Sequence, residues 1–252
     1  MITTEENIGF RADLHCHSTY SDGTASPHEL IDEAVNIGLS GLAITDHDNT
    51  QAFSNVKSYA KEKGILLIPG VELSTMHEDV NIHILGYGYD PEHPRLKNFC
   101  EGRSAKRKER MFAFSRKLQD FGIAITEEDI SLEMEKKVNS GKAWGRAHIA
   151  QMMFERGYVK NIKEAFEKYI GDKGPCYVDA KYPSVEEGIA IIRESGGLAV
   201  WAHPHFLKKE YLVREILGND FDGLECYYGR LPRYQEEKWL LIAKQRKFLA
   251  TG

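Results

Sequence analysis

The sequence predicts an α/β fold, and three observations carry that prediction. Seven short apolar runs of the kind that form buried strands recur along the chain and alternate with stretches of helical periodicity. The helical stretches are bounded by capping residues and glycines. The middle of the chain is different, since residues 97–182 are mostly helical and carry charge runs. We therefore expect an α/β domain interrupted by a helical insertion.

The strand candidates are residues 10–17, 41–47, 65–72, 81–87, 197–205, 222–228 and 247–252. Ser26-Pro27-His28-Glu29 reads as a helix start, with a capping box and a proline at the first helical position, and Ser184-Val185-Glu186-Glu187 repeats the box. Gly38 and Gly64 stand where two helices should end. The predicted organisation is a first barrel part at 1–96, a helical lid over the substrate site at 97–182, and a second barrel part at 183–252.

The composition is that of an ordinary globular protein, with 42% hydrophobic and 28% charged residues in 252. A net charge of −5 argues against a protein that coats long nucleic acid. No run is apolar and long enough for a membrane span, and the first residues lack the pattern of a signal peptide. The four cysteines are far apart, so we expect no disulfide framework and a cytoplasmic location.

Histidines and acidic residues recur at the ends of the predicted strands, which meet at one mouth in a (β/α) barrel. His15 and His17 are two residues apart, so on a strand both imidazoles point to one face and Cys16 points to the other. A carboxylate in an apolar run is costly unless it is paired or binds a metal. The candidate metal ligands are His15, His17, Asp22, His47, Glu72, His83 and His203. Any one alone would more often be a satisfied buried histidine or a capping aspartate, but together they favour a metal site.

A basic helix in the insertion carries Arg103, Arg107 and Arg110 on one stripe, and Phe114, Leu118 and Phe121 continue it. An apolar stripe should face the interior, so these arginines should face inward as well. The guanidinium fork matches phosphate oxygens, and pairing with acids of another element is an equal alternative.

Two further features concern anions and the ligands themselves. Arg146 and His148 lie in the first turns of a second helix, where the helix N-terminus favours an anion. Asp46 and Asp48 flank His47 and could be hydrogen-bond partners of metal ligands or, equally, solvated loop carboxylates.

The segments DLHCHSTYSDG, AITDHD, GVE, HILGY and AHP closely resemble those of the PHP superfamily, named for polymerase and histidinol phosphatase. Within it the chain resembles the branch of nucleoside 3',5'-bisphosphate phosphatases and RNase AM-like 5'-to-3' exoribonucleases of short RNA. The resemblance covers nearly the whole chain and implies a distorted, TIM-like (β/α)7 barrel with two or three divalent metal ions. Mixed histidine and carboxylate ligation favours Mn, Fe or Zn.

The resemblance also implies how the ligands are shared. The first metal takes His15, His17 and Glu72, the carboxylate of Glu72 bridges to a second metal with His83 and His203, and a third takes Asp22 and His47. Family members carry a Gly-Ser-Asp-x-His motif after the last strand that completes the first and third sites. This sequence ends with KFLATG at Gly252, so we expect a truncated C-terminal end and incomplete first and third sites.

The expected function is that of a metal-dependent phosphoesterase in which a metal-bridging hydroxide attacks phosphorus and His205 protonates the leaving oxygen. The expected substrate is a small bisphosphate nucleotide or the 5' end of a short oligoribonucleotide, with no long nucleic acid and no membrane as partner. In the family branch, a Gly-Arg-x-His-Ile-Ala segment binds substrate phosphate, which favours that role for Arg146 and His148. The alternatives are a histidinol-phosphate-type phosphatase and a non-catalytic metal- or nucleotide-binding module.

Overall fold

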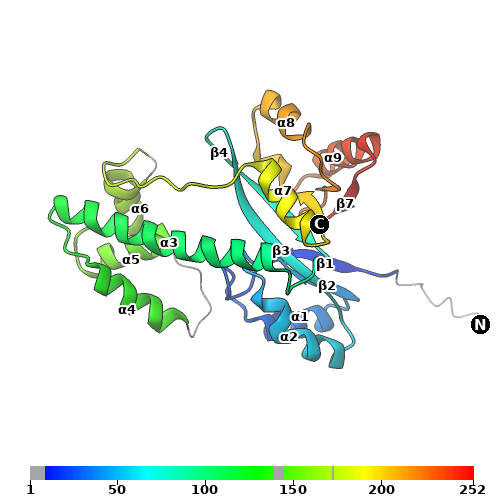
Figure 1. Ribbon diagram of the computed structural model, residues 1–252, viewed down its shortest axis with the longest axis horizontal. Helices are drawn as coiled ribbons and strands as arrows, with labels where there is room; N and C mark the ends of the chain where they lie inside the picture. Colours follow the sequence, from blue (N-terminus) through cyan, green and yellow to red (C-terminus); the bar gives the residue numbers. More distant parts are fainter. Residues whose placement is uncertain (1–8, 139–144, 172) are drawn as a thin grey trace, which may run out of the picture.

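The computed structural model describes residues 9–138, 145–171 and 173–252. All seven predicted strands form, and they make one curled sheet in the order β1-β2-β3-β4-β5-β6-β7. The strands are β1 Ala12–Cys16, β2 Gly41–Ile44, β3 Leu66–His77, β4 Val80–Tyr87, β5 Leu198–Trp201, β6 Gly223–Glu225 and β7 Leu249–Thr251. The two ends of the sheet approach each other, because the amide of Leu14 donates to the carbonyl of Gly252 at 3.1 Å. The chain therefore has the distorted TIM-like barrel that its sequence predicts (Figure 1).

One strand runs against the others. β3 and β4 form a hairpin, so β4 is antiparallel to β3 and also to β5, whereas the other neighbouring strands are parallel. β3 also continues to His77, so Glu72 lies within the strand and not at its end as predicted. His83 lies within β4 opposite Ser74, one side-chain period along from Glu72. The assumption that every ligand sits at the carboxyl end of a parallel strand is therefore wrong for these two residues.

Helices cover the outside of the sheet. α1 Pro27–Asn36 and α2 Gln51–Glu62 pack on β2, and α7 Val185–Glu194, α8 Glu210–Ile216 and α9 Arg233–Arg246 cover the other half (Figure 1). Both predicted N-caps are present, since the side chains of Ser26 and Ser184 accept from backbone amides. Gly38 and Gly64 have φ of 72° and 77°, the left-handed region that ends a helix cheaply only at glycine.

The insertion is helical and has a core of its own. It contains α3 Pro94–Asp120, α4 Glu127–Val138, α5 Arg146–Glu155 and α6 Ile162–Ala165, with a π-helical turn at Phe166–Ile170. A buried cluster runs through it from Met111 to Cys176, while the first turns of α3 pack into the barrel core through Leu96 and Cys100. The long α3 thus joins the two parts (Figure 1). The division at residue 97 stays a prediction.

Two details bear on earlier expectations. Phe114 and Leu118 are fully buried as predicted, but Phe121 is exposed because α3 ends at Asp120 and the chain turns away there. The four cysteines are unpaired. Among the helices of the described residues, none combines the length and apolarity needed to cross a bilayer.

Candidate metal centre and arginine pocket

Glu72 is the centre of a cluster of imidazoles. Its carboxylate is 1% exposed, and its oxygen Oε2 lies 3.4 Å from His15 Nε2, 3.1 Å from His17 Nε2 and 3.2 Å from His47 Nδ1. The other oxygen, Oε1, lies 2.9 Å from both His83 Nδ1 and His203 Nε2. One carboxylate therefore faces two groups of nitrogens, one group on each oxygen. This is the arrangement that a bridging ligand between two metal ions requires.

The donor set fits divalent ions. Glu72 Oε2 and His47 Nδ1 are buried without a hydrogen-bond partner, although each is a strong polar atom. The Nε2 atoms of His15 and His17 are 3.2 Å apart. Two nitrogens held tetrahedrally on one zinc ion at its usual bond length lie about 3.4 Å apart. Lone pairs that converge at this spacing are explained by a shared cation.

The cluster divides into three overlapping groups with metal-ligand spacing, namely His15-His17-Glu72, His17-Asp22-His47 and His47-Glu72-His83. Asp22 lies at the edge, with its side chain 64% exposed, and its carboxylate oxygens are 3.5 Å from His17 Nδ1 and 3.8 Å from His47 Nε2. The structure thus brings all seven predicted ligands together. The grouping differs from the one that the resemblance implies, because His17 and His47 each belong to two of the three groups rather than to one.

The charges of the cluster are strongly coupled. Burial by itself raises the pKa of Glu72, but the imidazoles that face its two oxygens outweigh burial and hold that pKa well below its ordinary value. Burial lowers the pKa of His15, but its bonds to Glu225 and Glu72 raise it to about 10. Burial lowers the pKa of His47 to about 4. Without a metal ion, the centre therefore holds an ionised carboxylate beside a neutral His47 and a protonated His15, and a metal ion that binds His15 would displace that proton.

The two aspartates beside His47 are both buried, so the alternative of solvated carboxylates is wrong. Asp46 accepts hydrogen bonds from the amide and hydroxyl of Ser18 and from the hydroxyl of Ser21, at 2.6–2.8 Å. Ser21 Oγ in turn lies 3.3 Å from His17 Nδ1. Asp46 therefore shapes the loop that carries His17 and Asp22. Asp48 instead accepts from the amide of Ser74 and faces the insertion.

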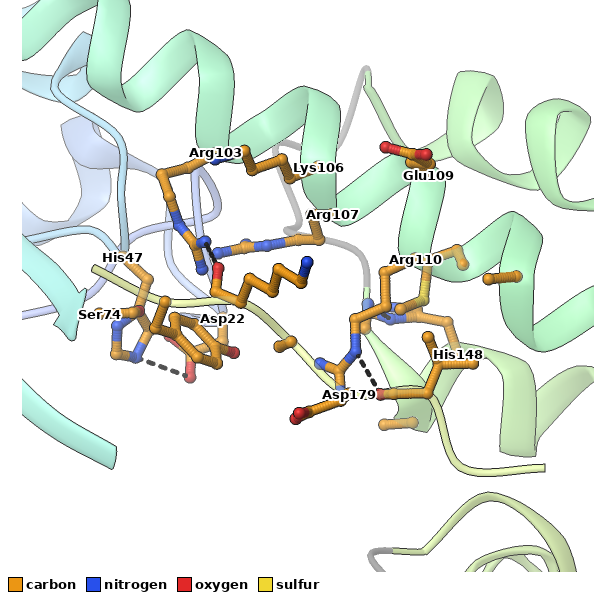
Figure 2. A pocket seen from close by; sticks show the side chains of 18 of the residues that line it. Asp22, His47, Ser74, Arg103, Lys106, Arg107, Glu109, Arg110, His148 and Asp179 are labelled. Atoms are coloured by element: carbon orange, nitrogen blue, oxygen red, sulfur yellow. Dashed lines mark hydrogen bonds and ion pairs between the residues drawn. The ribbon is translucent and has the colours of Figure 1, made fainter. Parts of the chain in front are cut away.

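A cavity of about 680 Å³ opens beside the cluster, and we call it the arginine pocket. Asp22, His47 and His83 form its wall on the metal side. Its cationic lining is Arg103, Lys106, Arg107, Arg110, Arg116, His148 and Lys181. In Figure 2, Arg103 and Arg107 reach from α3 toward His47 and Asp22, whereas Arg110 and His148 lie farther along the cavity. The arginine stripe thus faces the barrel mouth as predicted.

The near arginines are paired. Asp48 Oδ2 accepts from Arg107 Nη2 at 3.1 Å and from Arg103 Nε at 3.4 Å. Arg103 also donates to the carbonyl of Lys181 at 2.8 Å and stacks 4.4 Å from the ring of Tyr182. The alternative of pairing with an acid of another element is therefore confirmed for these two arginines. They also line the cavity, and their role in phosphate recognition stays a prediction.

The far arginines are held differently. Arg110 donates to the carbonyl of Val178 at 2.9 Å, and its guanidinium lies 5.8 Å from the ring of Tyr177. Arg146 lies 5.5 Å from the same ring and donates to the carbonyl of Ile170. Burial lowers the pKa of Arg110, and the positive charge of Arg146 acts in the same direction. The negative charge of Asp179, which also lines the cavity, acts on Arg110 in the opposite direction.

The family model for the PHP domain matches residues 13–174 of the chain. The chain belongs to the PHP family. It is 36% identical to a 5'-3' exoribonuclease of Haemophilus influenzae, over 90% of this chain and 84% of that protein. It is 33% identical to a 3',5'-nucleoside bisphosphate phosphatase of Chromobacterium violaceum, over 95% of this chain and 85% of that one.

The solved structures agree. A metal-dependent phosphoesterase of Bifidobacterium adolescentis superposes with a TM-score of 0.78 at 30% identity, over 97% of this chain and 86% of that one. This PHP protein is therefore a hydrolase, a metal-dependent phosphoesterase. The alternative of a non-catalytic binding module is not supported, since the relatives are named for hydrolysis.

Glu225 is a residue of this PHP site that the sequence analysis missed. Its carboxylate is buried at the end of β6, where it accepts from His15 Nδ1 at 2.8 Å and from the backbone amide of His203. The first bond presents Nε2 of His15 to the cluster, and the second holds His203 at a φ of 32°, which is strained for a non-glycine residue. Glu72 was predicted because it is a carboxylate at the end of an apolar run. Glu225 also ends an apolar strand, so the same pattern could have predicted it.

His205 is not brought into the cluster. The residue is 9% exposed, its ring lies 4.3 Å from that of Phe206 and 4.7 Å from that of Tyr228, and it does not line the arginine pocket. Its role as a proton donor stays a prediction that this geometry does not support.

Proposed function

We propose that this PHP protein hydrolyses the phosphate ester on the 3' oxygen of a nucleotide that also carries a 5'-phosphate. The observation that carries the proposal is that the metal cluster and the arginine pocket form one continuous site, since Asp22, His47 and His83 belong to both. A substrate that spans the site would place one phosphate at the ligands and a second among the arginines. A free nucleoside bisphosphate and the 5' end of a short oligoribonucleotide both meet this requirement.

The names of the relatives support this substrate class. An exoribonuclease that works from 5' to 3' and a 3',5'-bisphosphate phosphatase share one chemical unit, a nucleoside with phosphate on both the 5' and the 3' oxygen. We assign the 5'-phosphate to the arginine pocket, beside Arg110 and His148, which both line it. The 3'-phosphate then lies at the cluster. In the reaction a water oxygen joins phosphorus, the bond from phosphorus to the 3' oxygen breaks, and that oxygen takes up a proton.

The ligand set fits two or three ions of Mn, Fe or Zn, which when bound would lower the pKa of water and neutralise phosphoryl charge. His15, His17 and Glu72 would hold one ion, and Glu72, His83 and His203 a second. Asp22, His17 and His47 would hold a third. The chain's own contribution is orientation, because Glu225 and Ser21 each lie against the outer nitrogen of a ligand imidazole.

Asp48 links the two halves of the proposed site. It follows His47 directly and pairs with Arg103 and Arg107, so the near arginines keep a fixed place beside the ligands. Asp48 partly neutralises Arg103 and Arg107, while Asp179 is the acidic neighbour of Arg110. The unpaired cysteines support the proposal of a reducing, cytoplasmic setting.

The test is a comparison of substrates with the metal-loaded protein. We expect release of inorganic phosphate from a nucleoside 3',5'-bisphosphate at a kcat/KM at least about 100-fold above that for the matching nucleoside 3'-monophosphate, because the second phosphate supplies charge-assisted hydrogen bonds. Histidinol phosphate, the substrate of the alternative phosphatase, should be hydrolysed no better than the monophosphate. Equal turnover of mono- and bisphosphates would contradict the two-phosphate site.

A further inference from the structure

Asp48 lies between the barrel and the insertion, and its carboxylate contacts both. Its oxygen Oδ1 accepts from the amide of Ser74 at 2.9 Å, and its own backbone amide donates to the carbonyl of Glu72 at 2.9 Å. Both partners belong to β3. Asp48 is therefore fixed to the strand that carries the central carboxylate of the cluster, and its second oxygen, Oδ2, faces the arginines of α3.

The backbone of Asp48 is held in a conformation that few residues adopt. Its φ is 50°, in the left-handed region, which aspartate tolerates better than most residues but still at a cost in free energy. Its side chain is 2% exposed, and a buried carboxylate is costly unless other groups pair with it. Such a residue persists only where its neighbours hold it, and residues of this kind gather at functional sites.

Asp48 also fixes the place of Arg107. Arg107 Nη2 donates to Asp48 Oδ2 at 3.1 Å, and among the described residues Asp48 is the hydrogen-bonding partner of this arginine. A guanidinium carries several N–H donors in one plane, so a single bond to Asp48 leaves others for a ligand. Arg107 lines the arginine pocket and reaches toward His47 and Asp22 (Figure 2). Its remaining donors therefore lie on the side of the pocket that adjoins the cluster.

Arg110 occupies a different place in the same pocket. It follows Arg107 by three residues on α3, which moves it about 4.5 Å along the helix axis. It donates to the carbonyl of Val178, and Asp179 is its acidic neighbour. In Figure 2 it lies near His148, farther along the cavity. One arginine therefore adjoins the cluster, and the other adjoins the far part of the pocket.

We propose that Arg107 binds the phosphoryl group that reacts at the cluster, that Arg110 binds the second phosphate, and that Asp48 is the positioning residue for Arg107. This inference rests on the proposed function and assigns its two phosphates to different arginines. Hydrogen-bond donors that are in place before charge develops on the phosphoryl oxygens need no reorganisation during the reaction. Asp48 provides this order, because its carboxylate ties Arg107 to the strand of Glu72.

The direction of the effect distinguishes positioning from charge neutralisation. If Asp48 only reduced the positive charge of the pocket, Asp48→Asn would strengthen the attraction for phosphate and would raise kcat/KM or leave it unchanged. Because Asp48 positions Arg107, Asp48→Asn should instead lower kcat/KM, since the guanidinium remains but is held less firmly.

The experiment measures kcat/KM of the metal-loaded full chain on a nucleoside 3',5'-bisphosphate and on the matching nucleoside 3'-monophosphate. Arg107→Ala should lower kcat/KM by about 10- to 100-fold on both, the range for loss of a hydrogen bond to a charged group. Asp48→Asn should lower both by about 3- to 30-fold. Arg110→Ala should lower kcat/KM on the bisphosphate alone. Removal of Arg107 from Asp48→Asn should cost at least about threefold less than its removal from the wild type, because the two residues act as a unit.

Asp32→Asn is the matched control. Asp32 also pairs with a basic side chain, Lys63 at 3.1 Å, but lies outside both the cluster and the arginine pocket, so its loss should leave both substrates at the wild-type value. Metal content and thermal unfolding show whether each variant is loaded and folded. Arg107→Ala tests the assignment of the phosphates even where Asp48→Asn does not fold, because the Arg107 side chain is 27% exposed.

The outcomes separate the two proposals. A loss in Arg107→Ala on the bisphosphate alone overturns the inference, because Arg107 would then bind the second phosphate. An unchanged or raised kcat/KM in Asp48→Asn, or additive losses in the double variant, overturns the positioning role of Asp48. Equal wild-type turnover of both nucleotides overturns the proposed two-phosphate site, while the variants on the monophosphate still decide whether Asp48 acts through Arg107. Failure of the metal-loaded wild type on both nucleotides overturns both proposals.

Discussion

The metal cluster and the arginine pocket meet at His47 and His83 but are built in different ways. Six of the seven candidate ligands of the cluster come from five strands or strand ends, and the seventh, Asp22, comes from the loop after β1. The arginines of the pocket come from α3, and carbonyl oxygens, an aromatic ring and Asp48 hold those nearest the cluster or next to it. The cluster is set by many distant contacts, and the pocket by helical periodicity and long side chains. Because the two regions are held by different contacts, a substitution in the cluster should impair catalysis, and a substitution in the arginine pocket should impair substrate binding.

The largest expected effect is loss of the Glu72 carboxylate, which we propose bridges two metal ions. Glu72→Gln should remove bound metal and reduce kcat/KM by more than about 1,000-fold, because a neutral amide cannot bridge two cations. The metal content is measured by elemental analysis beside the phosphate-release assay. Glu237→Gln, on the exposed face of α9, is the matched control. A variant that keeps its metal and its activity would contradict the central role of Glu72.

Loss of the Glu225 carboxylate, which accepts hydrogen bonds from His15 and from the amide of His203, should reduce metal binding less than loss of Glu72. Glu225→Gln should weaken metal binding by about 10- to 100-fold, the range for a residue that orients a ligand imidazole. Metal titration should show the weaker affinity, and excess metal should restore much of kcat. A variant with normal metal affinity but low kcat would show that Glu225 does not act through His15 and His203.

Loss of an arginine from the arginine pocket should change KM and leave metal binding as it is. Arg110→Ala should raise KM for the bisphosphate by about 10- to 100-fold and leave metal content unchanged, because a charge-assisted phosphate contact is lost. Added salt should reduce the difference in KM between the variant and the wild type, because salt screens the charge of Arg110. Lys108→Ala, two residues earlier on α3 and outside the pocket lining, should match the wild type. Loss of metal in Arg110→Ala would contradict the conclusion that substrate binding in the arginine pocket is independent of metal binding in the cluster.

The smallest expected effect concerns the fold of the insertion. Arg156 donates to both oxygens of Asp129, at 2.7 and 2.9 Å, and its side-chain bonds hold the pKa of Asp129 well below the ordinary value. A carboxyl whose pKa is lower in the folded state than in the unfolded state stabilises the fold at pH values above the unfolded-state pKa. That stabilisation is lost as the pH falls through the folded-state pKa. The pair is partly exposed, so Asp129→Asn should cost less than about 1 kcal/mol near neutral pH.

Denaturation at several pH values measures this effect. The difference between Asp129→Asn and the wild type should shrink as the pH falls below about 4, where the unfolded-state carboxyl becomes protonated. Metal content should be the same in both proteins at neutral pH. A constant difference across the pH range would mean that the ion pair is not its source.

Much of the fold and the site follows from local pattern. The apolar runs predicted the strands, and the capping residues at Ser26 and Ser184 predicted two helix starts. The period of a strand placed His15 and His17 on one face, and the period of a helix aligned Arg103, Arg107 and Arg110. These features depend on residues within a few positions of one another, so one sequence suffices to find them.

Other features required the tertiary structure. The reversed direction of β4 decides that His83 reaches Glu72 from within a strand, and the register of β3 puts Glu72 far from a strand end. The assignment of Asp46 to a serine loop and of Asp48 to arginines could not be read from their shared place beside His47. Glu225 stands 210 residues from His15 along the chain.

The sequence by itself determined which elements form, which residue types gather at the mouth, and which helix face carries positive charge. Only the tertiary structure decided which candidate ligands face each oxygen of Glu72, which acid Arg103 and Arg107 meet, and that the arginine pocket opens beside the cluster. The reason is physical. Periodicity is set by backbone geometry within one element, whereas a contact between distant atoms depends on strand direction, register and packing, which no local pattern specifies.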